Sequence, residues 1–594
     1  MLYAIVAFPL IIMAFLALIL RNHDTLIKYS ALIASILSLI LAIMLFLNSK
    51  SIVVQDFTWF SVGNLQFNIA FINSSINIIA LLVVAVITPL IFLYSIGFMN
   101  VPSEQARFYF EISLFAASMM LFTISYSLIS LFIAWELLGI TSYLLIGFWY
   151  WKKAPPYAAR KAITIIFIGD ILFLSGIIII GMTYNNFLIS ALFTIPEKPV
   201  IYVALILILL GAFSKSAEFP FEEWLPDAME GPTPVSAFLH SSTMVKAGIL
   251  LIAFILPIYA AYNLLNVILF IGIISAIIGA SNALTSRHIK KILAYSTVED
   301  LGFMFIALGL NNLMAAMMLF IAQAFYKALL FMGAGALMRA NENKEDIYEI
   351  KGATINKLVY ISLIFGVASL AAIFPLGGFF GKVIIEDTTS GLVYIILLFI
   401  EFVSTLYIFR WLFVLMEEPN KDIESLKINY KLLPKTMLFA MLLLVFFVSF
   451  SSIAYFYLPK VLFSDGLLNF LYNSLLIDSI IALIGIYISY LFFYKRKIII
   501  KETYSWYKYA YMLLYNNTII NLFYLYFVEF FGYISYITEG IELSIEKLFY
   551  KSGDATLLLS NKLRKIENGQ INTYALSFIF GIFLILLIIV IFYL

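Results

Sequence analysis

Long apolar runs recur along almost the whole chain, and they limit what it can fold into more than any other feature. A helix needs about 20 apolar residues to cross the hydrocarbon core of a bilayer. Sixteen runs of suitable length are present, two of them interrupted, and hydrophobic residues make up 63% of the 594 residues. Charged residues make up only 12%, whereas a soluble domain carries about 25%. A water-soluble fold cannot enclose so much apolar surface, so the chain is predicted to be an all-α polytopic membrane protein.

The predicted spans divide the chain into six parts. These are N-terminal helices with an external hairpin (1–107), two five-helix blocks (108–257 and 258–415), additional helices (416–500), a lateral amphipathic helix (501–567) and an anchoring span (568–594). The spans are predicted near 2–20, 28–47, 72–98, 109–125, 127–148, 160–182, 199–229, 233–257, 264–284, 294–310, 313–338, 358–386, 391–415, 432–458, 475–494 and 571–594.

The basic residues indicate how these spans are oriented, because cytoplasmic loops are enriched in lysine and arginine. Of the 36 basic residues, 28 lie in connections after odd-numbered spans, and only Lys50, Lys198 and Lys460 lie in connections after even-numbered spans. The other five lie within predicted spans. We therefore expect a multi-pass protein of the cell membrane, with the basic loops and the lateral helix on the cytoplasmic side and both termini outside.

The remaining composition narrows the chemistry that the chain can carry. The 36 basic and 34 acidic residues nearly balance, so no excess of positive charge indicates a nucleic-acid partner. The chain has no cysteine and three histidines, which excludes disulfides and iron–sulfur ligation and argues against a haem or metal centre. No cofactor and no metal is expected on this chain.

Two segments outside the spans have distinct patterns. Residues 48–71 are polar and alternate in polarity, which predicts a β-hairpin. Residues 501–567 are rich in aromatic, Ile and Leu residues but are interrupted by charged residues and by Asn516 and Asn517. A long amphipathic helix along the membrane or along partner proteins explains this pattern. A further span remains the alternative, although it would place the basic end of the segment outside.

Ionisable residues within the predicted spans are the first candidates for function, because a charge at bilayer depth costs several kcal/mol. The candidates are Glu136, Asp170, Lys215, His240, Lys246, Lys327, Lys382 and Arg410. A single lysine near a helix end can extend its ammonium to the membrane surface, and a single Glu–Lys pair can simply join helices. Four lysines, a histidine and two acids near the middle of separate spans instead indicate a chain of groups that passes protons. With so few acids nearby, we expect the lysines to lie in cation-rich surroundings.

Two spans contain the irregular backbone that is typical of transport sites. One carries Pro220 shortly after Lys215, and the other carries Pro375, Gly377 and Gly378 shortly before Lys382. Proline removes a backbone donor and breaks a helix, and such a break at membrane depth is tolerated where it is buried in protein or lines a wet cavity. Interrupted spans at corresponding places in two five-helix blocks predict two inverted repeats.

Several motifs carry a resemblance to a known family. They are Leu131–Tyr150 with its Ala-Trp-Glu-Leu-Leu-Gly sequence, Trp224–Gly248 with Leu-Pro-Asp-Ala-Met-Glu-Gly-Pro-Thr-Pro-Val-Ser, Ile289–Thr297, Ala324–Phe331 and Gly378–Lys382. In these stretches the chain resembles the antiporter-like subunits of respiratory complex I and of Mrp cation/proton antiporters. Its C-terminal part is similar to that of the L-type subunit, in which a long lateral helix precedes a final anchor.

The resemblance implies roles for individual residues. Glu136 and Lys215 would form the charge pair of the first half-channel, and His240 and Lys246 would continue a central hydrophilic axis. Lys327 would link the two halves, and Lys382 would lie at the second break on the exit side. Asp170, Gln323 and Glu386 would support this relay.

The chain departs from the L-type pattern at several positions. Phe167 replaces an arginine near Asp170, Leu319 and Gln323 replace histidines near Lys327, and Val383 replaces the acid after Lys382, for which Glu386 is a possible substitute. Lys246 stands where threonine is more common in L-type subunits and matches other antiporter-like subunits instead. The detailed course of the relay therefore stays open.

The resemblance leaves three functional hypotheses. The first is a proton-translocating membrane-arm subunit of a complex I-like quinone oxidoreductase, with iron–sulfur clusters and quinone on partner subunits that the lateral helix contacts. The second is a subunit of an Mrp-type Na+/H+ antiporter or a membrane-bound hydrogenase. The third is a structural subunit whose polar axis is vestigial. The electron donor, the quinone type, the stoichiometry and the choice between H+ and Na+ cannot be inferred from the residues.

Overall fold

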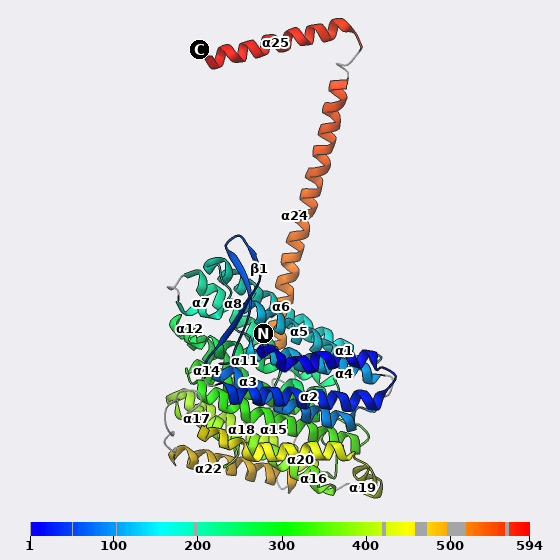
Figure 1. Ribbon diagram of the computed structural model, residues 1–594, viewed down its shortest axis with the longest axis vertical. Coiled ribbons are helices and arrows are strands. Elements are labelled where there is room, and N and C mark those ends of the chain that lie inside the picture. Colours follow the sequence, from blue (N-terminus) through cyan, green and yellow to red (C-terminus); the bar gives the residue numbers. More distant parts are fainter. Residues whose placement is uncertain are drawn as a thin grey trace, which may run out of the picture. The chain divides into compact units, whose positions relative to one another are not determined.

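The computed structural model describes residues 2–49, 51–101, 104–194, 199–417, 423–457, 472–495, 518–564 and 569–593. The chain forms two compact units, Met1–Tyr515 and Asn516–Leu594. Almost all described elements are helices, and the one exception is a two-stranded sheet (Figure 1).

The first unit contains the helices that carry the predicted sites. In chain order its main elements are α1 (Phe8–Ile19), α2 (Asp24–Asn48), β1 (Val54–Val62), β2 (Leu65–Ile72), α3 (Ser75–Phe98), α4 (Gln105–Ile124), α5 (Leu128–Ile146), α6 (Ala154–Tyr184), α7 (Ile189–Thr194), α8 (Pro199–Lys215), α9 (Trp224–Asp227), α10 (Thr233–Ser241), α11 (Met244–Phe254), α12 (Leu256–Ala261), α13 (Leu265–Thr285), α14 (Ile289–Gly309), α15 (Leu313–Ala340), α16 (Lys357–Leu370), α17 (Gly377–Asp387), α18 (Gly391–Leu415), α19 (Ile423–Lys431), α20 (Lys435–Phe450) and α22 (Tyr472–Ser489).

Thirteen helical segments among the described residues are long and apolar enough to cross a membrane. The prediction of a polytopic, mostly helical membrane protein is thereby confirmed. The three other predicted spans coincide with shorter apolar helices, Tyr3–Ile19, Pro199–Lys215 and Lys357–Leu370. The count of sixteen spans stays a prediction, because length and apolarity alone do not place these short helices across a bilayer.

Successive spans cross in opposite directions, so connections after odd-numbered spans should lie on one side and those after even-numbered spans on the other. Contacts between connections follow this pattern. After the eleventh predicted span, the Arg339 guanidinium donates a 2.6 Å hydrogen bond to the carbonyl oxygen of Gly97, at the end of the third. After the fourth span, the backbone N–H of Tyr126 donates a 2.8 Å bond to the carbonyl oxygen of Ala70, in the connection after the second. Odd-numbered connections thus meet odd ones, and even-numbered connections meet even ones.

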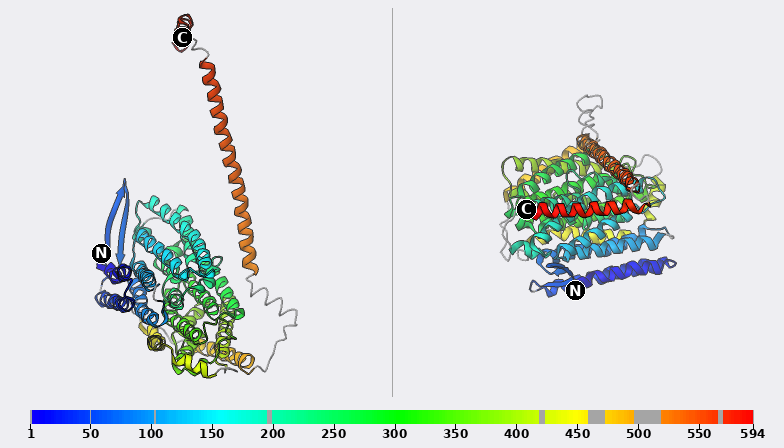
Figure 2. Two further views of the ribbon diagram at one scale, coloured as in Figure 1. Left: turned by 90° about the vertical axis from the view of Figure 1, so that its right-hand side faces the viewer. Right: turned by 90° about the horizontal axis from the view of Figure 1, so that it is seen from above.

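The predicted hairpin is present. Strand β1 pairs antiparallel with β2, from Val54 opposite Ile72 to Val62 opposite Leu65. The turn needs a left-handed residue, which Gly63 supplies with a φ of 60°. Figure 2 shows the two strands beside the N-terminal helices, where the amide of Tyr3 bonds the Gln55 side chain. Which side of the membrane the hairpin occupies stays a prediction.

Both predicted helix breaks are confirmed. Helix α8 ends at Lys215, five residues before Pro220, and α16 ends at Leu370, five residues before Pro375. In each case a short helix resumes after the proline, α9 in the first break and α17 in the second. The lysines differ in position, since Lys215 precedes its break and Lys382 follows its own within α17.

The two breaks share one backbone pattern. Ala217 and Ala372, each three residues before the proline, both adopt a φ of 53°. The next amide in each break, of Glu218 or Ile373, donates a 2.9 Å bond to a carbonyl five residues back. This left-handed helix ending satisfies carbonyls that the break would otherwise expose. The match supports the repeat locally, while two complete inverted repeats stay a prediction.

Gly378 is required by the second break. A Cβ atom at this position would lie 1.8 Å from the carbonyl oxygen of Ser369. We expect Gly378→Ala to force the start of α17 away from α16 and to cost about 1–3 kcal/mol, measured as a lower melting temperature of the purified protein. Gly540→Ala is the matched control, because a Cβ there meets nothing within 4 Å. Equal melting temperatures of the two variants would contradict this close approach.

A third interruption was not predicted. The predicted span 233–257 corresponds to the candidate span Thr233–Phe254, but the helix is interrupted within it, since α10 ends at Ser241 and α11 begins at Met244. The Thr243 hydroxyl donates a 2.7 Å hydrogen bond to the carbonyl oxygen of Phe238. Hydroxyl side chains compete in this way with the backbone bonds of a helix. The interruption separates His240 from Lys246, two residues of the predicted axis.

Several buried ionisable groups, among them His240, Lys246 and Lys327, lie on the most enclosed helices. In the most apolar 18-residue stretch of α14, of α15 and of the α10–α11 segment, 94% of the residues are buried. The corresponding share in α13 and in α18 is 44%. Helix α14 packs between α13 and α15, and α15 packs against α17 (Figure 1). The charges are therefore sheltered by other helices, as the cost of a charge in hydrocarbon requires.

The second unit consists of two helices. Helix α24 (Thr518–Arg564) runs unbroken for 47 residues, about 70 Å at 1.5 Å per residue, and α25 (Ile571–Tyr593) has the apolarity of a span. Helix α24 is not among the candidate spans, which favours the predicted lateral helix over an additional span. Residues 501–517 and 565–567 of that prediction lie outside the described residues. That α24 lies along the membrane or along partners stays a prediction.

Candidate functional site

Lys215 lies at the junction of three helices, α5, α6 and α8. Its buried ammonium is 3.5 Å from a carboxylate oxygen of Asp170 and donates a 2.8 Å hydrogen bond to the carbonyl oxygen of Trp135. The same Trp135 donates its indole N–H to Asp170. Lys215, Asp170 and Trp135 thus form one closed group at the end of α8, directly before the first break.

The predicted partner of Lys215 was Glu136, and the structure gives a different one. Glu136 is half-buried on α5, and the ion pair found in the described residues joins Lys215 to Asp170 instead. Phe167 stands where an arginine partner of Asp170 was expected, and it is 57% exposed. The partners of Asp170 among the described residues are Lys215 and Trp135.

His240, Gln323 and Lys246 lie together in the middle of the unit. The His240 ring stacks on Phe331 with 5.1 Å between centroids, and both its nitrogens lack a hydrogen-bond partner among the described residues. The Gln323 amide donates a 3.2 Å bond to the carbonyl oxygen of His240. The Lys246 ammonium donates a 2.5 Å bond to the carbonyl oxygen of Phe320 and, within the described part of the chain, has no ion pair. Lys246 is thus held by a dipole rather than by a carboxylate.

Two further lysines are paired with acids that the sequence reasoning missed. The Lys327 ammonium on α15 is 3.0 Å from Asp300 and 2.6 Å from the Ser296 hydroxyl. The Lys382 ammonium on α17 is 3.3 Å from Glu299, and a 3.3 Å bond joins it to the carbonyl oxygen of Leu370. All four charged side chains are fully buried.

The expectation of cation-rich surroundings is therefore wrong. Lys215, Lys327 and Lys382 each have a carboxylate partner. Glu299 and Asp300 lie within the predicted span 294–310 and could have been found by the rule that singled out the lysines. Further buried acids are Glu218 and Glu222 at the first break and Glu111 on α4. Arg410, by contrast, bonds two backbone carbonyls at the end of α13, which indicates a structural role.

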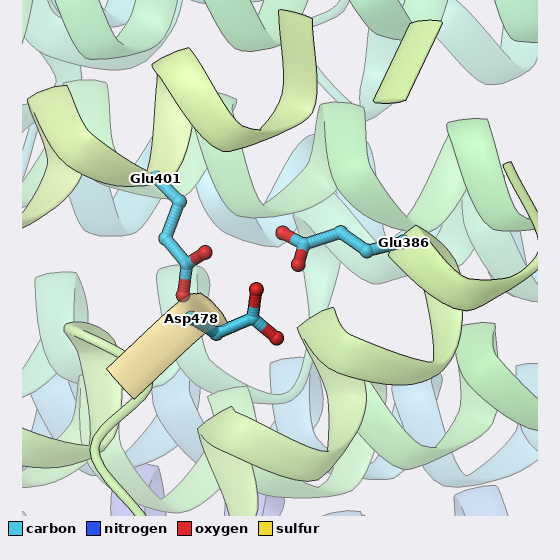
Figure 3. A group of neighbouring side chains, drawn as sticks. All are labelled: Glu386, Glu401 and Asp478. Atoms are coloured by element: carbon cyan, nitrogen blue, oxygen red, sulfur yellow. The ribbon is translucent and has the colours of Figure 1, made fainter. Parts of the chain in front are cut away.

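Glu386 does not pair with Lys382 but belongs to a group of three carboxylates. Glu386 on α17, Glu401 on α18 and Asp478 on α22 each place an oxygen within 4.8 Å of the others (Figure 3). All three are buried, and among the described residues none of their oxygens has a hydrogen-bond partner outside the group. Carboxylate oxygens suit hard cations, and carboxyl groups this close can also share protons. Sequence reasoning missed Glu401 and Asp478, although both lie in predicted spans.

The predicted relay residues thus fall into separate groups in the structure. Lys215 lies with Asp170, His240 with Gln323, Lys327 with Asp300, and Lys382 with Glu299. Among the described residues, no hydrogen bond or ion pair joins one of these groups directly to the next. Passage between groups would depend on water or on movement of side chains.

Comparisons with known proteins identify the family. Residues 125–408 match the family described as "NADH:quinone oxidoreductase/Mrp antiporter, TM", and residues 59–109 match "NADH-Ubiquinone oxidoreductase (complex I), chain 5 N-terminus". The chain is 30% identical over 627 residues to the NADH-quinone oxidoreductase subunit L of Buchnera aphidicola, covering 100% of this chain and 99% of that protein. It is 32% identical over 605 residues to the chloroplastic NAD(P)H-quinone oxidoreductase subunit 5 of Mesostigma viride, covering 94% and 92%.

A solved structure shows the same fold. The Mrp complex from a Dietzia species contains a chain that matches with a TM-score of 0.67 at 20% identity, covering 99% of this chain and 63% of that one. The match extends over the breaks and the enclosed helices described above. Because the motifs, the family models and the full-length relatives agree, the chain belongs to the family of antiporter-like membrane subunits that includes subunit L of NADH-quinone oxidoreductase.

Proposed function

We propose that this chain is the L-type, proton-translocating membrane-arm subunit of a complex I-like, redox-driven quinone oxidoreductase. The observation that carries the proposal is the set of three buried lysine–carboxylate pairs, two of them beside broken helices. Relatives that match over nearly the whole length are named as subunits of quinone oxidoreductases. Their names support the redox-driven setting, and the pairs support proton transfer within this chain.

The geometry suggests how a proton would be moved. In low-dielectric surroundings an ammonium and a carboxylate at 3–4 Å attract each other strongly. Separating the pair weakens the hold on the ammonium proton, and restoring it strengthens that hold. Lys215 is the last residue of α8 and lies directly before a break. Movement at the break would thus control the distance from Lys215 to Asp170.

The remaining parts of the machine would lie on other subunits. The chain has no cysteine for iron–sulfur ligation, so the clusters and the quinone site are assigned to partners. Helix α24 would contact neighbouring membrane-arm subunits, and this chain would do no redox chemistry itself. We assign the protein to the cell membrane, with its basic connections and α24 on the cytoplasmic side and both termini outside.

The proposal is tested by isolating the chain with its neighbours. An affinity tag on this subunit should retain quinone-reducing, iron–sulfur-containing subunits in mild detergent, identified by mass spectrometry. Inside-out membrane vesicles should then take up protons in proportion to the quinone that the complex reduces. Recovery of cation/proton antiporter subunits alone, with no iron–sulfur partner, would contradict the proposal.

A second candidate function is ion exchange in an Mrp-type Na+/H+ antiporter or a membrane-bound hydrogenase. The group Glu386, Glu401 and Asp478 favours it, because three buried carboxylates suit a small cation as well as protons. In that case translocation should depend on sodium, and Glu401→Gln should change the sodium dependence. Full proton uptake in sodium-free buffer would count against this alternative.

A further inference from the structure

Helix α14 carries two adjacent acids at the centre of the unit. Glu299 and Asp300 are consecutive residues of α14, and 94% of the residues in the most apolar stretch of this helix are buried. Both acidic side chains are fully buried. Neighbouring residues on a helix point in different directions. Asp300 accordingly reaches Lys327 on α15, whereas Glu299 reaches Lys382 on α17. One turn of α14 thus lies between two lysines that the family motifs place in the relay.

The contacts of each acid are within hydrogen-bond distance. The Lys327 ammonium is 3.0 Å from Asp300, and the Lys382 ammonium is 3.3 Å from Glu299. Glu299 also accepts a 2.7 Å bond from the Tyr407 hydroxyl and one from Ser404, both on α18. Its carboxylate is therefore fixed from three sides, while Asp300 depends mainly on Lys327. Of the two acids, Glu299 would be the more firmly held, and Asp300 would be the one whose position depends on Lys327.

The residues that replace the expected histidines near Lys327 cannot pass a proton in this way. Leu319 and Gln323 replace the histidines expected there, and the Gln323 amide is bound to the backbone of His240. An amide does not titrate. Among the described residues around Lys327, the carboxylate within reach is Asp300, so the link towards the second half of the unit would pass through α14.

The position of these acids is fixed by close helix packing. A Cβ atom at Gly279 of α13 would lie 2.5 Å from the backbone nitrogen of Glu299. Close backbone contact through small residues is the usual way in which membrane helices hold each other. Gly279 therefore lets α14 lie close against α13 at the level of Glu299, where the two acids reach the two lysines.

We propose that Glu299 and Asp300 form a carboxylate bridge that passes protons from Lys327 to Lys382. A proton leaves the Lys327 ammonium for Asp300, which becomes a neutral carboxylic acid while the lysine becomes a neutral amine. The proton moves on to Glu299, directly or through water, and from there to Lys382, provided that Lys382 has released its own proton ahead. The sum is one proton moved from Lys327 to Lys382, with both carboxylates restored. This inference rests on the proposed function.

The test compares isosteric and acid-retaining variants in the complete complex. Glu299→Gln and Asp300→Asn keep size and hydrogen bonding but cannot hold a transferable proton. We expect each to lower proton uptake per quinone reduced, in inside-out vesicles, by about 100-fold, the scale of a lost proton-transfer group. Glu299→Asp and Asp300→Glu should retain most of the uptake. Glu349→Gln, in an exposed loop, is the control and should leave uptake unchanged.

Each outcome decides between the bridge and its alternatives. Unchanged uptake in Glu299→Gln or Asp300→Asn would overturn the bridge. Equal loss in the amide and acid-retaining variants, with a lower melting temperature in both, would show that the acids only hold the helices together. Lys215→Met, measured in parallel, separates the two proposals. If Lys215→Met is inactive while the amide variants pump, the bridge alone fails, and if Lys215→Met pumps normally, the relay itself fails.

Discussion

Lys215→Met is expected to abolish proton translocation by the assembled complex. Methionine fills a similar volume without a proton to give, so the first group of the path loses its carrier. The change also leaves Asp170 buried beside the Trp135 indole without its ammonium. Breaking a buried pair by removing one partner costs about 3–5 kcal/mol, so we expect a lower melting temperature as well. Proton uptake per quinone reduced, in inside-out vesicles, is the measurement that checks the main effect.

A second substitution separates the loss of function from the loss of stability. Asp170→Asn combined with Lys215→Met replaces the ion pair by neutral groups, and we expect it to restore most of the melting temperature. It should not restore proton uptake. Lys152→Met, in an exposed connection, is the matched control for a lysine change. Normal uptake in the stable double variant would show that this pair is a structural contact and not part of the path.

Deleting residues 501–567 should release the subunit from its neighbours. The deletion removes α24, whose large apolar residues are exposed along the described part of the helix, including Tyr526, Phe530, Ile541 and Phe549. A long exposed apolar surface marks an interaction site. The expected result is a smaller complex on native gels, with the first unit still folded and inserted.

A shorter deletion tests whether the length of α24 matters. Removing residues 533–550 takes out 18 residues, five helical turns, so that the remaining faces keep their phase while the helix shortens by about 27 Å. We expect partial release of the partner subunits that the far end contacts. A complex of full size and stability after both deletions would contradict the proposal that α24 binds neighbouring subunits.

Much of the architecture could be predicted because it depends on local physical rules. Apolar runs predicted the spans, and proline marked the breaks before α9 and α17. The basic residues in alternate connections predicted how the spans are oriented. The interruption at Ser242 and Thr243 was not predicted. It involves a hydroxyl that donates a hydrogen bond to a backbone carbonyl of its own helix, and such a bond does not change the hydropathy of the segment. The lysines could be found because a charge within an apolar span is conspicuous, and they lie in the region that the family model covers.

The partners of the lysines could not be predicted in the same way. Which carboxylate meets Lys215 depends on how α5, α6 and α8 pack, and in the packed structure Asp170 takes this place rather than the motif residue Glu136. Glu299 and Asp300 lie on a span with neither a basic candidate nor a helix break, and only the packing of α14 against α15 and α17 joins them to lysines. Asp478 comes from a span beyond the two predicted blocks and joins Glu386 and Glu401 only in three dimensions. Charge pairing is a property of the packed molecule, whereas span placement is a property of single segments.

Trp135 can report optically on the Lys215–Asp170 pair. Its indole N–H bonds the carboxylate of Asp170, its carbonyl accepts the ammonium of Lys215, and that ammonium lies 4.4 Å from its ring centre. The light absorption and emission of an indole shift with the electric field across the ring, and here both members of a charged pair contact the tryptophan. Whenever the lysine gains or loses its proton, or the pair opens, the field on Trp135 changes. The spectrum of one native tryptophan, among seven in the chain, is therefore coupled to the charge state of the Lys215–Asp170 pair.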